Sequence, residues 1–129
     1  MAIYVDSSAI VKLAVREPES AALRRYLQRK RPLVSSALSR AEVLRALLPA
    51  GEEAVARGRS VLRRFDLIRL NDRILNAAGL LLPTGLRTLD AIHLATARQL
   101  GDEVRALVTY DGRMAEAARQ LDYRIVNPD

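Results

Sequence analysis

The sequence predicts a three-layer α/β/α sandwich built on a mostly parallel central sheet, folded as a single domain over residues 1–129. Short apolar segments alternate with amphipathic helical segments along the whole chain. Strands that are apolar throughout are typical of a parallel sheet with helices on both faces. Half of the residues are hydrophobic, which is enough for a core of that kind, and the length suits one compact domain.

The first half of the chain contains strands and helices that are each defined by local signals. The apolar run at residues 3–5 suits a buried strand, and Ser7 and Ser8 offer an N-cap for a helix that Pro18 breaks. Apolar side chains on one face mark the next helix, and LVSS follows as a second strand. The turn at residues 49–51 ends the helix after it. The expected elements are a strand at 3–5, helices at 9–15 and 19–30, a strand at 33–36 and a helix at 39–48.

The second half repeats this alternation of helices and strands. A helix with apolar positions at helical spacing precedes the apolar strand DLIRL. The next helix ends at the turn formed by residues 83–85, and Gly101 suits the C-cap of the helix after that. ALVTY and YRIV are the last two strand candidates. The expected elements are helices at 52–65, 72–82, 88–100 and 112–121, and strands at 66–70, 106–110 and 123–126.

Composition and hydropathy restrict the compartment and the chemistry. The chain has no cysteine, so a disulfide framework, a thiolate metal site and a cysteine nucleophile are excluded. Asp6 interrupts the apolar N-terminal run, which is therefore unlike a secretory signal. The longest uncharged run, residues 74–86, contains proline and glycine and is shorter than the ~20 residues that span a bilayer. We therefore expect a cytoplasmic protein with no membrane segment.

The charge balance is basic. The chain has 21 basic and 15 acidic residues and a formal net charge of +6, which favours a polyanionic partner but also serves solubility. All of the basic residues except Lys12 and Lys30 are arginines. A compositional bias would explain this, and so would phosphate recognition, for which the guanidinium fork is suited. Both explanations stay open on composition alone.

Four acidic residues lie at or near the expected entrances of helices. Asp6 follows the first strand, and Asp111 follows the fourth. Glu42 and Asp90 lie in the first turns of two other helices. In a parallel sheet, the carboxyl ends of the strands lead into helix N-termini at one edge, and sites form there. We therefore expect three of these carboxylates to gather at that edge, and Asp90 could join them from its helix.

Each of these acids also has a purely structural explanation. Asp6 could simply help to start its helix, and Asp111 suits an N-cap or a turn. Ser39 and Glu42 have the S-x-x-E spacing of a capping box, which would explain Glu42 without any chemistry. Asp90 suits the positive end of a helix dipole. The single residues therefore decide nothing, and their convergence has to carry the argument.

Four carboxylates at one edge would repel each other unless protons or a cation neutralised them. An all-oxygen set without cysteine predicts a hard cation, Mg²⁺ or Mn²⁺. Such a cation binds through a few carboxylates and substrate phosphate oxygens, and it suits the hydrolysis of a phosphodiester by metal-activated water. An acidic site within a basic chain is what a nuclease requires.

Four segments, in this order, resemble the PIN-domain ribonucleases, and most closely the VapC toxins of type II toxin–antitoxin systems. They are IYVDSSAIVKL (3–13), SSALSRAEVLRAL (35–47), LRTLDAIHLATA (86–97) and LVTYDGRMAEAA (107–118). The resemblance implies a PIN-like fold and a Mg²⁺- or Mn²⁺-dependent endoribonuclease that acts on RNA. It also implies a homodimer and a cognate VapB-like antitoxin as partners.

The resemblance also assigns roles to individual residues. Its metal-binding and catalytic quartet falls on the four acids named above, Asp6, Glu42, Asp90 and Asp111. Ser8 and Thr109 match hydroxyl residues that support the site. His93, the only histidine, follows Asp90 by three residues, and it could act as a general base or pack behind that aspartate. Arg87 and Arg113 stand next to site segments, where they could touch RNA phosphates or remain solvated surface charges.

Two other classes of function compete with the nuclease. A non-catalytic module that binds RNA or a protein partner would use the same acids only as caps and as a stabilising metal site. An aspartyl-phosphate phosphatase would normally have D-x-D after the first strand, whereas this chain has Asp6-Ser7-Ser8. Neither the P-loop nor the dinucleotide-binding glycine motif occurs.

Overall fold

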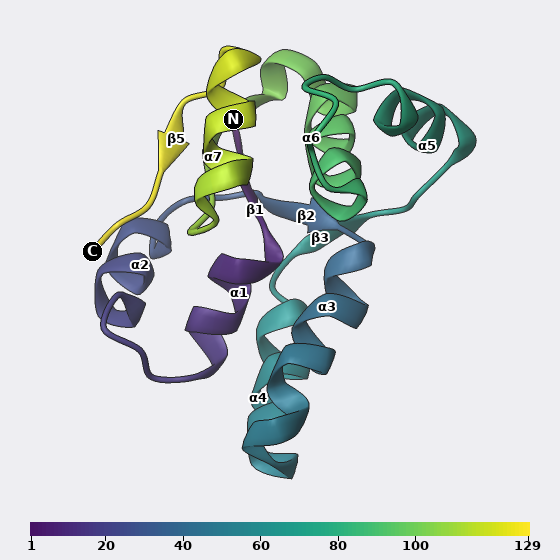
Figure 1. Ribbon diagram of the computed structural model, residues 1–129. Coiled ribbons are helices and arrows are strands. Elements are labelled where there is room, and N and C mark those ends of the chain that lie inside the picture. Colours follow the sequence, from purple (N-terminus) through teal and green to yellow (C-terminus); the bar gives the residue numbers. More distant parts are fainter.

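In the computed structural model, which describes residues 1–129, five parallel strands form one sheet in the order β3-β2-β1-β4-β5 (Figure 1). The central strand β1 pairs through Ile3 with Leu33 of β2 and with Ala106 of β4. The chain therefore leaves β1 toward one side for β2 and returns on the other side for β4, which is the topology that opens a crevice at the carboxyl ends. The strands are β1 (Ala2–Val5), β2 (Leu33–Ser36), β3 (Asp66–Ile68), β4 (Val104–Val108) and β5 (Ile125–Val126).

Helices cover both faces of this sheet, so the expected three-layer sandwich is confirmed. One face packs on α1 (Ser7–Ala14), α2 (Ser20–Leu27), α3 (Leu38–Leu47) and α4 (Glu52–Leu62). The other face packs on α6 (Thr88–Leu100) and α7 (Gly112–Gln120), and α5 (Asp72–Gly79) packs against α6. Short 3₁₀ turns at Leu48–Ala50 and Gly101–Glu103 complete the chain.

The core divides between the two faces as the pleat of the strands requires. Ile3 and Val5 belong to the cluster with the α1–α4 layer, whereas Tyr4 belongs to the cluster with α6 and α7. Successive side chains of a strand point to opposite faces, which explains this division. The continuous apolar run in β1 is therefore buried on both sides.

Several expected boundaries differ from the observed ones. The fourth strand was expected at 106–110 but covers Val104–Val108, because Val104 pairs with Ala2 in β1. The last strand shortens to Ile125–Val126. Three helices (α2, α4 and α5) end three residues early, and three others end one residue early. Gly101 is confirmed as the C-cap of α6, with a φ of 59°. The expectation that Ser7 or Ser8 caps the first helix is wrong, because Asp6 is its N-cap.

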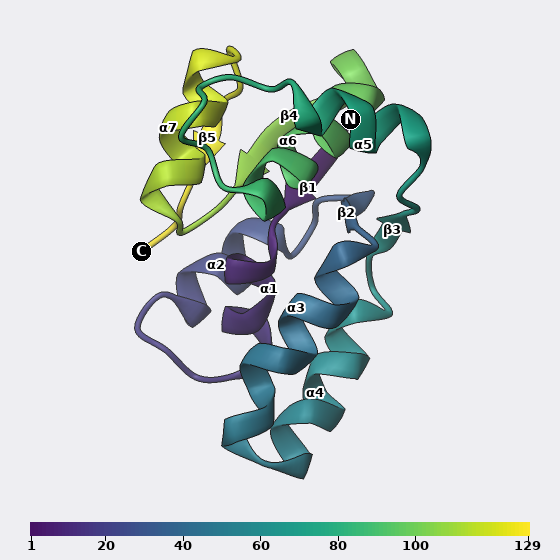
Figure 2. The same ribbon diagram turned by 45° about the vertical axis from the view of Figure 1, so that its right-hand side comes forward.

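Figure 2 shows α3 and α4 extending side by side away from the sheet. Gly58 of α4 lies against Leu47 of α3, and a Cβ atom on this glycine would overlap the leucine side chain. The two helices therefore pack closely at this position.

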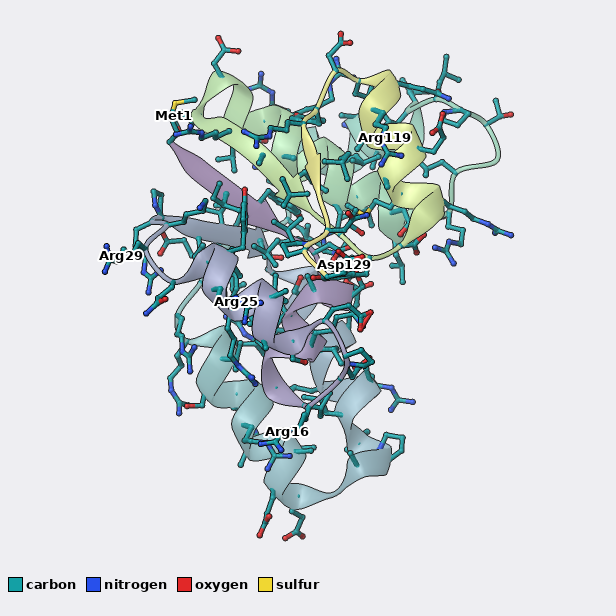
Figure 3. All side chains as sticks on the ribbon, turned by 90° about the vertical axis from the view of Figure 1, so that its left-hand side faces the viewer. Met1, Arg16, Arg25, Arg29, Arg119 and Asp129 are labelled. Atoms are coloured by element: carbon teal, nitrogen blue, oxygen red, sulfur yellow. The ribbon has the colours of Figure 1, made fainter.

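Figure 3 shows Arg16, Arg25 and Arg29 on the outside of the molecule, and all three are exposed. None of the helices is long and apolar enough to cross a membrane.

Candidate active site

The neighbouring strands β1 and β4 place two of the four acids beside each other. Asp6 directly follows β1, and Asp111 comes three residues after the end of β4. Both are N-caps: Asp6 Oδ1 accepts a hydrogen bond from the backbone N–H of Ala9 at 3.1 Å, and Asp111 Oδ1 accepts one from that of Arg113 at 2.9 Å. The capping explanation is thus true of both residues, and it leaves Oδ2 of each carboxylate free for other partners.

Two hydroxyl groups hold Asp6 from opposite sides. Thr109 Oγ1 donates to Asp6 Oδ2 at 2.5 Å, and Ser8 Oγ donates to Asp6 Oδ1 at 2.7 Å. Thr109 Oγ1 also accepts the backbone N–H of Asp111 at 3.0 Å, so one side chain connects the two aspartates. Asp6 is only 4% exposed, and burial raises the pKa of its carboxyl, while the bonds from Thr109 and Ser8 oppose that rise.

Glu42 faces the same place from α3. Its Oε1 accepts from Ser7 Oγ and from Nε2 of His93, the latter at 2.7 Å. Burial alone would raise the pKa of Glu42, but the hydrogen bonds from His93 and Ser7 lower it below its ordinary value. The carboxylate of Glu42 is therefore held in its charged form.

The capping-box explanation of Glu42 is wrong. The helix α3 begins at Leu38, with Ala37 in the N-cap position and no side-chain cap. Ser39 Oγ instead bonds Ser35 Oγ in the core at 2.7 Å, and Ser36 Oγ accepts the backbone N–H of Leu38 at 3.0 Å. Glu42 is left free to face the site.

His93 is positioned by a residue that sequence reasoning missed. The Tyr4 hydroxyl lies 2.7 Å from His93 Nδ1, and the two rings meet edge to face. Both residues are buried, and the other ring nitrogen faces Glu42. A tyrosine hydroxyl that donates to Nδ1 leaves the proton on Nε2, where it bonds the carboxylate. No local signal could have identified Tyr4, because its strand pattern predicts only burial.

Asp90 and Asp111 share one arginine. Arg87 Nε donates to Asp90 Oδ2 at 2.9 Å, and Arg87 Nη2 donates to Asp111 Oδ2. Burial opposes a low pKa for Asp111, but the Met114 backbone N–H and Arg87 hold it below its ordinary value. Arg87 therefore lies in the site itself, whereas Arg113 is exposed in the first turn of α7.

These residues line one open cavity of about 350 Å³ that contains all four acids. Its wall is oxygen-rich, with Leu89 as its one hydrophobic residue, and its lining also includes Ser7, Ser8, Arg87, Thr88 and His93. No three of its acidic or histidine side chains are arranged as a ready metal-ligand set, because each carboxylate is turned toward a hydroxyl, a histidine or Arg87. Carboxylate and hydroxyl oxygens nevertheless fit a hard cation, and the guanidinium already brings positive charge there.

Residues 3–120 match the PIN domain family. The chain is 61% identical to Ribonuclease VapC46 of Mycobacterium tuberculosis over 127 residues, which are 98% of either chain. It is 41% identical to Ribonuclease VapC35 of the same species, over 98% of this chain and 96% of that one.

Two solved structures share the fold. The crystal structure of VapC20, a sarcin–ricin loop cleaving toxin of Mycobacterium tuberculosis, aligns with a TM-score of 0.76 at 18% identity. It covers 89% of this chain and 94% of that one. A toxin–antitoxin complex from Klebsiella pneumoniae aligns with a TM-score of 0.74 at 21% identity and 98% coverage of both chains.

Proposed function

The chain belongs to the PIN-domain family, and we propose that it is a VapC-type endoribonuclease, the toxin of a toxin–antitoxin pair. The observation that carries this proposal is the convergence of Asp6, Glu42, Asp90 and Asp111 on one cavity at the carboxyl edge of the sheet. The high identity to relatives named ribonucleases, over almost the whole chain, supports the same activity.

The four acids would hold the metal ion, which we propose to be Mg²⁺ or Mn²⁺. A bound ion of this kind supplies positive charge for the phosphate and acidity for an attacking water. The chain's own contribution is to fix the ligands before the ion arrives. Thr109 and Ser8 hold Asp6, and Ser7 and His93 hold Glu42 in its charged form.

His93 acts in this proposal as a positioning residue and not as the general base. Its ring is 2% exposed, and both nitrogens are engaged, one by Tyr4 and the other by Glu42. A general base must reach the proton that it removes, either directly or through one water. The buried ring is instead suited to orient the Glu42 carboxylate, as the partners of metal ligands commonly do.

A VapB-like antitoxin and a homodimeric state belong to the same proposal. The names of the relatives and the toxin–antitoxin complexes among the structures with this fold support the antitoxin. The homodimer rests on the family resemblance alone. The antitoxin would cover the acidic cavity or its rim, because that is where the activity has to be blocked. Copurification with the product of an adjacent gene, followed by size determination of the complex, tests both claims.

The nuclease is tested with purified protein and total RNA in Mg²⁺ or Mn²⁺, followed by mapping of new RNA ends. Asp90→Asn protein and EDTA are the negative controls, and Glu116→Gln, which removes an exposed acid that does not line the cavity, is the matched control. Discrete cuts that survive only in wild type and Glu116→Gln support the proposal. Folded, antitoxin-free protein that stabilises on Mn²⁺ addition yet cuts no RNA would favour a binding module.

A further inference from the structure

One guanidinium holds together two carboxylates that come from different helices. Arg87 Nε bonds Asp90 at the start of α6, and Arg87 Nη2 bonds Asp111 at the start of α7. The bond to Asp90 measures 2.9 Å, and both aspartates contribute their Oδ2 atom. This is the fork geometry for which arginine, and not lysine, is suited.

At Asp111, the oxygen taken by Arg87 is the one that a metal ion would need. Asp111 Oδ1 is already engaged by the backbone N–H groups of Arg113 and Met114, at 2.9 and 3.2 Å. Oδ2 is therefore the oxygen through which Asp111 can bind a cation without uncapping α7. A cation bound there has to compete with Arg87 for the same lone pairs.

The guanidinium of Arg87 can also move away from the two aspartates without disrupting the helix. Its side chain is 51% exposed, and it lies at the N-cap position of α6 without a side-chain capping bond. The helix start depends on its backbone instead, since the Arg87 carbonyl accepts the Ala91 N–H at 2.9 Å. The guanidinium can therefore swing into solvent while the helix keeps its first turn.

The other two acids have no such cation. Asp6 is held by hydroxyl and backbone donors, and Glu42 by Ser7 and His93. In the metal-free protein, Arg87 is thus the arginine that pairs with two of the four acids of the cavity. Once released at the rim, the same positive charge faces the position from which an RNA phosphate would approach.

We infer that Arg87 is a built-in counter-ion of the metal-free site, which a divalent cation must displace, so that this residue weakens and thereby sets the metal affinity. The inference rests on the proposed function, because it takes the four acids as the metal ligands. It assigns Arg87 two alternating positions, on Asp90 and Asp111 without metal and at the cavity rim with metal.

The test is calorimetric titration of Mn²⁺ into the metal-free full-length chain. Arg87→Gln should bind Mn²⁺ more tightly than wild type, by roughly three- to tenfold, which is the scale of two exposed ion pairs. Arg98→Gln is the matched control, because it removes the same charge from the exposed last turn of the same helix. In a thermal melt, Arg87→Gln should be less stable than wild type in EDTA and should gain more from Mn²⁺.

The inference is overturned if Arg87→Gln binds Mn²⁺ as tightly as wild type or more weakly. It is also overturned if Arg98→Gln gains as much Mn²⁺ affinity as Arg87→Gln, or if none of the proteins binds Mn²⁺. Cleavage of RNA by wild type is measured separately. If wild type cuts RNA while Arg87→Gln shows no gain in affinity, the nuclease stands and the counter-ion fails. If Arg87→Gln gains affinity while wild type cuts no RNA, the counter-ion stands and the proposed activity fails.

Discussion

Replacement of Thr109 by valine tests whether the site is held together by hydrogen bonds before metal binds. Thr109 is fully buried, and its hydroxyl donates to Asp6 at 2.5 Å while it accepts the Asp111 N–H at 3.0 Å. Valine has nearly the same shape, so it removes these two bonds without opening a cavity. The buried Asp6 carboxylate then keeps only the donors on the side of Ser8 and Ala9.

The expected cost follows from the two bonds. A hydrogen bond to a charged group contributes about 1.5–3 kcal/mol, and a donor left without a partner costs about 1–3 kcal/mol. The valine methyl group returns about 0.8 kcal/mol through burial. Because the Asp111 N–H is only partly buried, a water can replace its lost acceptor. We therefore expect Thr109→Val to lose about 1–3 kcal/mol of unfolding free energy in EDTA at pH 7.

The assay is urea unfolding of the metal-free protein, with Thr109→Ser as the control that keeps the hydroxyl. Since Thr109 opposes the raised pKa of Asp6, its loss should raise that pKa further. A folded-state pKa above the unfolded value means that stability increases as the pH falls and Asp6 takes up its proton. The difference in unfolding free energy between wild type and Thr109→Val should therefore become smaller in acid. A deficit below about 0.5 kcal/mol at pH 7, or one that is independent of pH, would refute the reasoning.

Three further predictions use the same measurements. Asp6→Asn should be more stable than wild type in EDTA at neutral pH, because burial raises the pKa of Asp6 and the charged carboxylate therefore destabilises the folded wild type. This gain in stability should vanish as acid protonates Asp6 of the wild type. A difference in unfolding free energy that stays the same down to low pH would contradict the prediction. Tyr4→Phe should weaken Mn²⁺ binding about tenfold in calorimetry, because His93 loses the partner that orients it toward Glu42, and wild-type affinity in this variant would exclude that role. Gly58→Ala should lower the unfolding free energy in urea by about 1 kcal/mol, because the overlap of the new methyl group with Leu47 outweighs the higher helix propensity of alanine. Gly79→Ala is the control and should not destabilise the protein, because the space around its Cβ position is open.

The sequence was sufficient to predict the layers of the fold and the cluster of acids. Both follow from one fact, that apolar strands of a parallel sheet must end at a common edge. Asp6 and Asp111 each follow a strand at that edge, and β1 and β4 are neighbours in the sheet. Asp90 reaches the same cavity from the first turn of α6, as predicted. Glu42 reaches it too, but its expected place in a first helical turn is wrong, because α3 begins at Leu38 and Glu42 is the fifth residue of that helix.

The partners of these acids could not be predicted, because they depend on tertiary contacts between distant segments. Tyr4 and His93 are 89 residues apart, and nothing near Tyr4 indicates a polar partner for its hydroxyl. Ser39 and Glu42 have the spacing of a capping box, but the core bond of Ser39 to Ser35 competes with it and wins. For Arg87 the sequence left two roles open, contact with RNA phosphates or a solvated surface charge. In the structure Arg87 bonds two acids of its own chain, which no charge pattern specifies.

Asp6 and Asp111 are both helix caps and proposed metal ligands. This pair of roles determines how a mutation could abolish the proposed activity. Asparagine caps a helix about as well as aspartate does, through the same oxygen. One base change in the codon of Asp111 therefore removes the negative charge while the cap of α7 remains. Under the proposed function, such an allele would encode a folded protein that cuts no RNA and can still bind the antitoxin. Folded, inactive protein from such an allele would then compete with the active protein for the antitoxin.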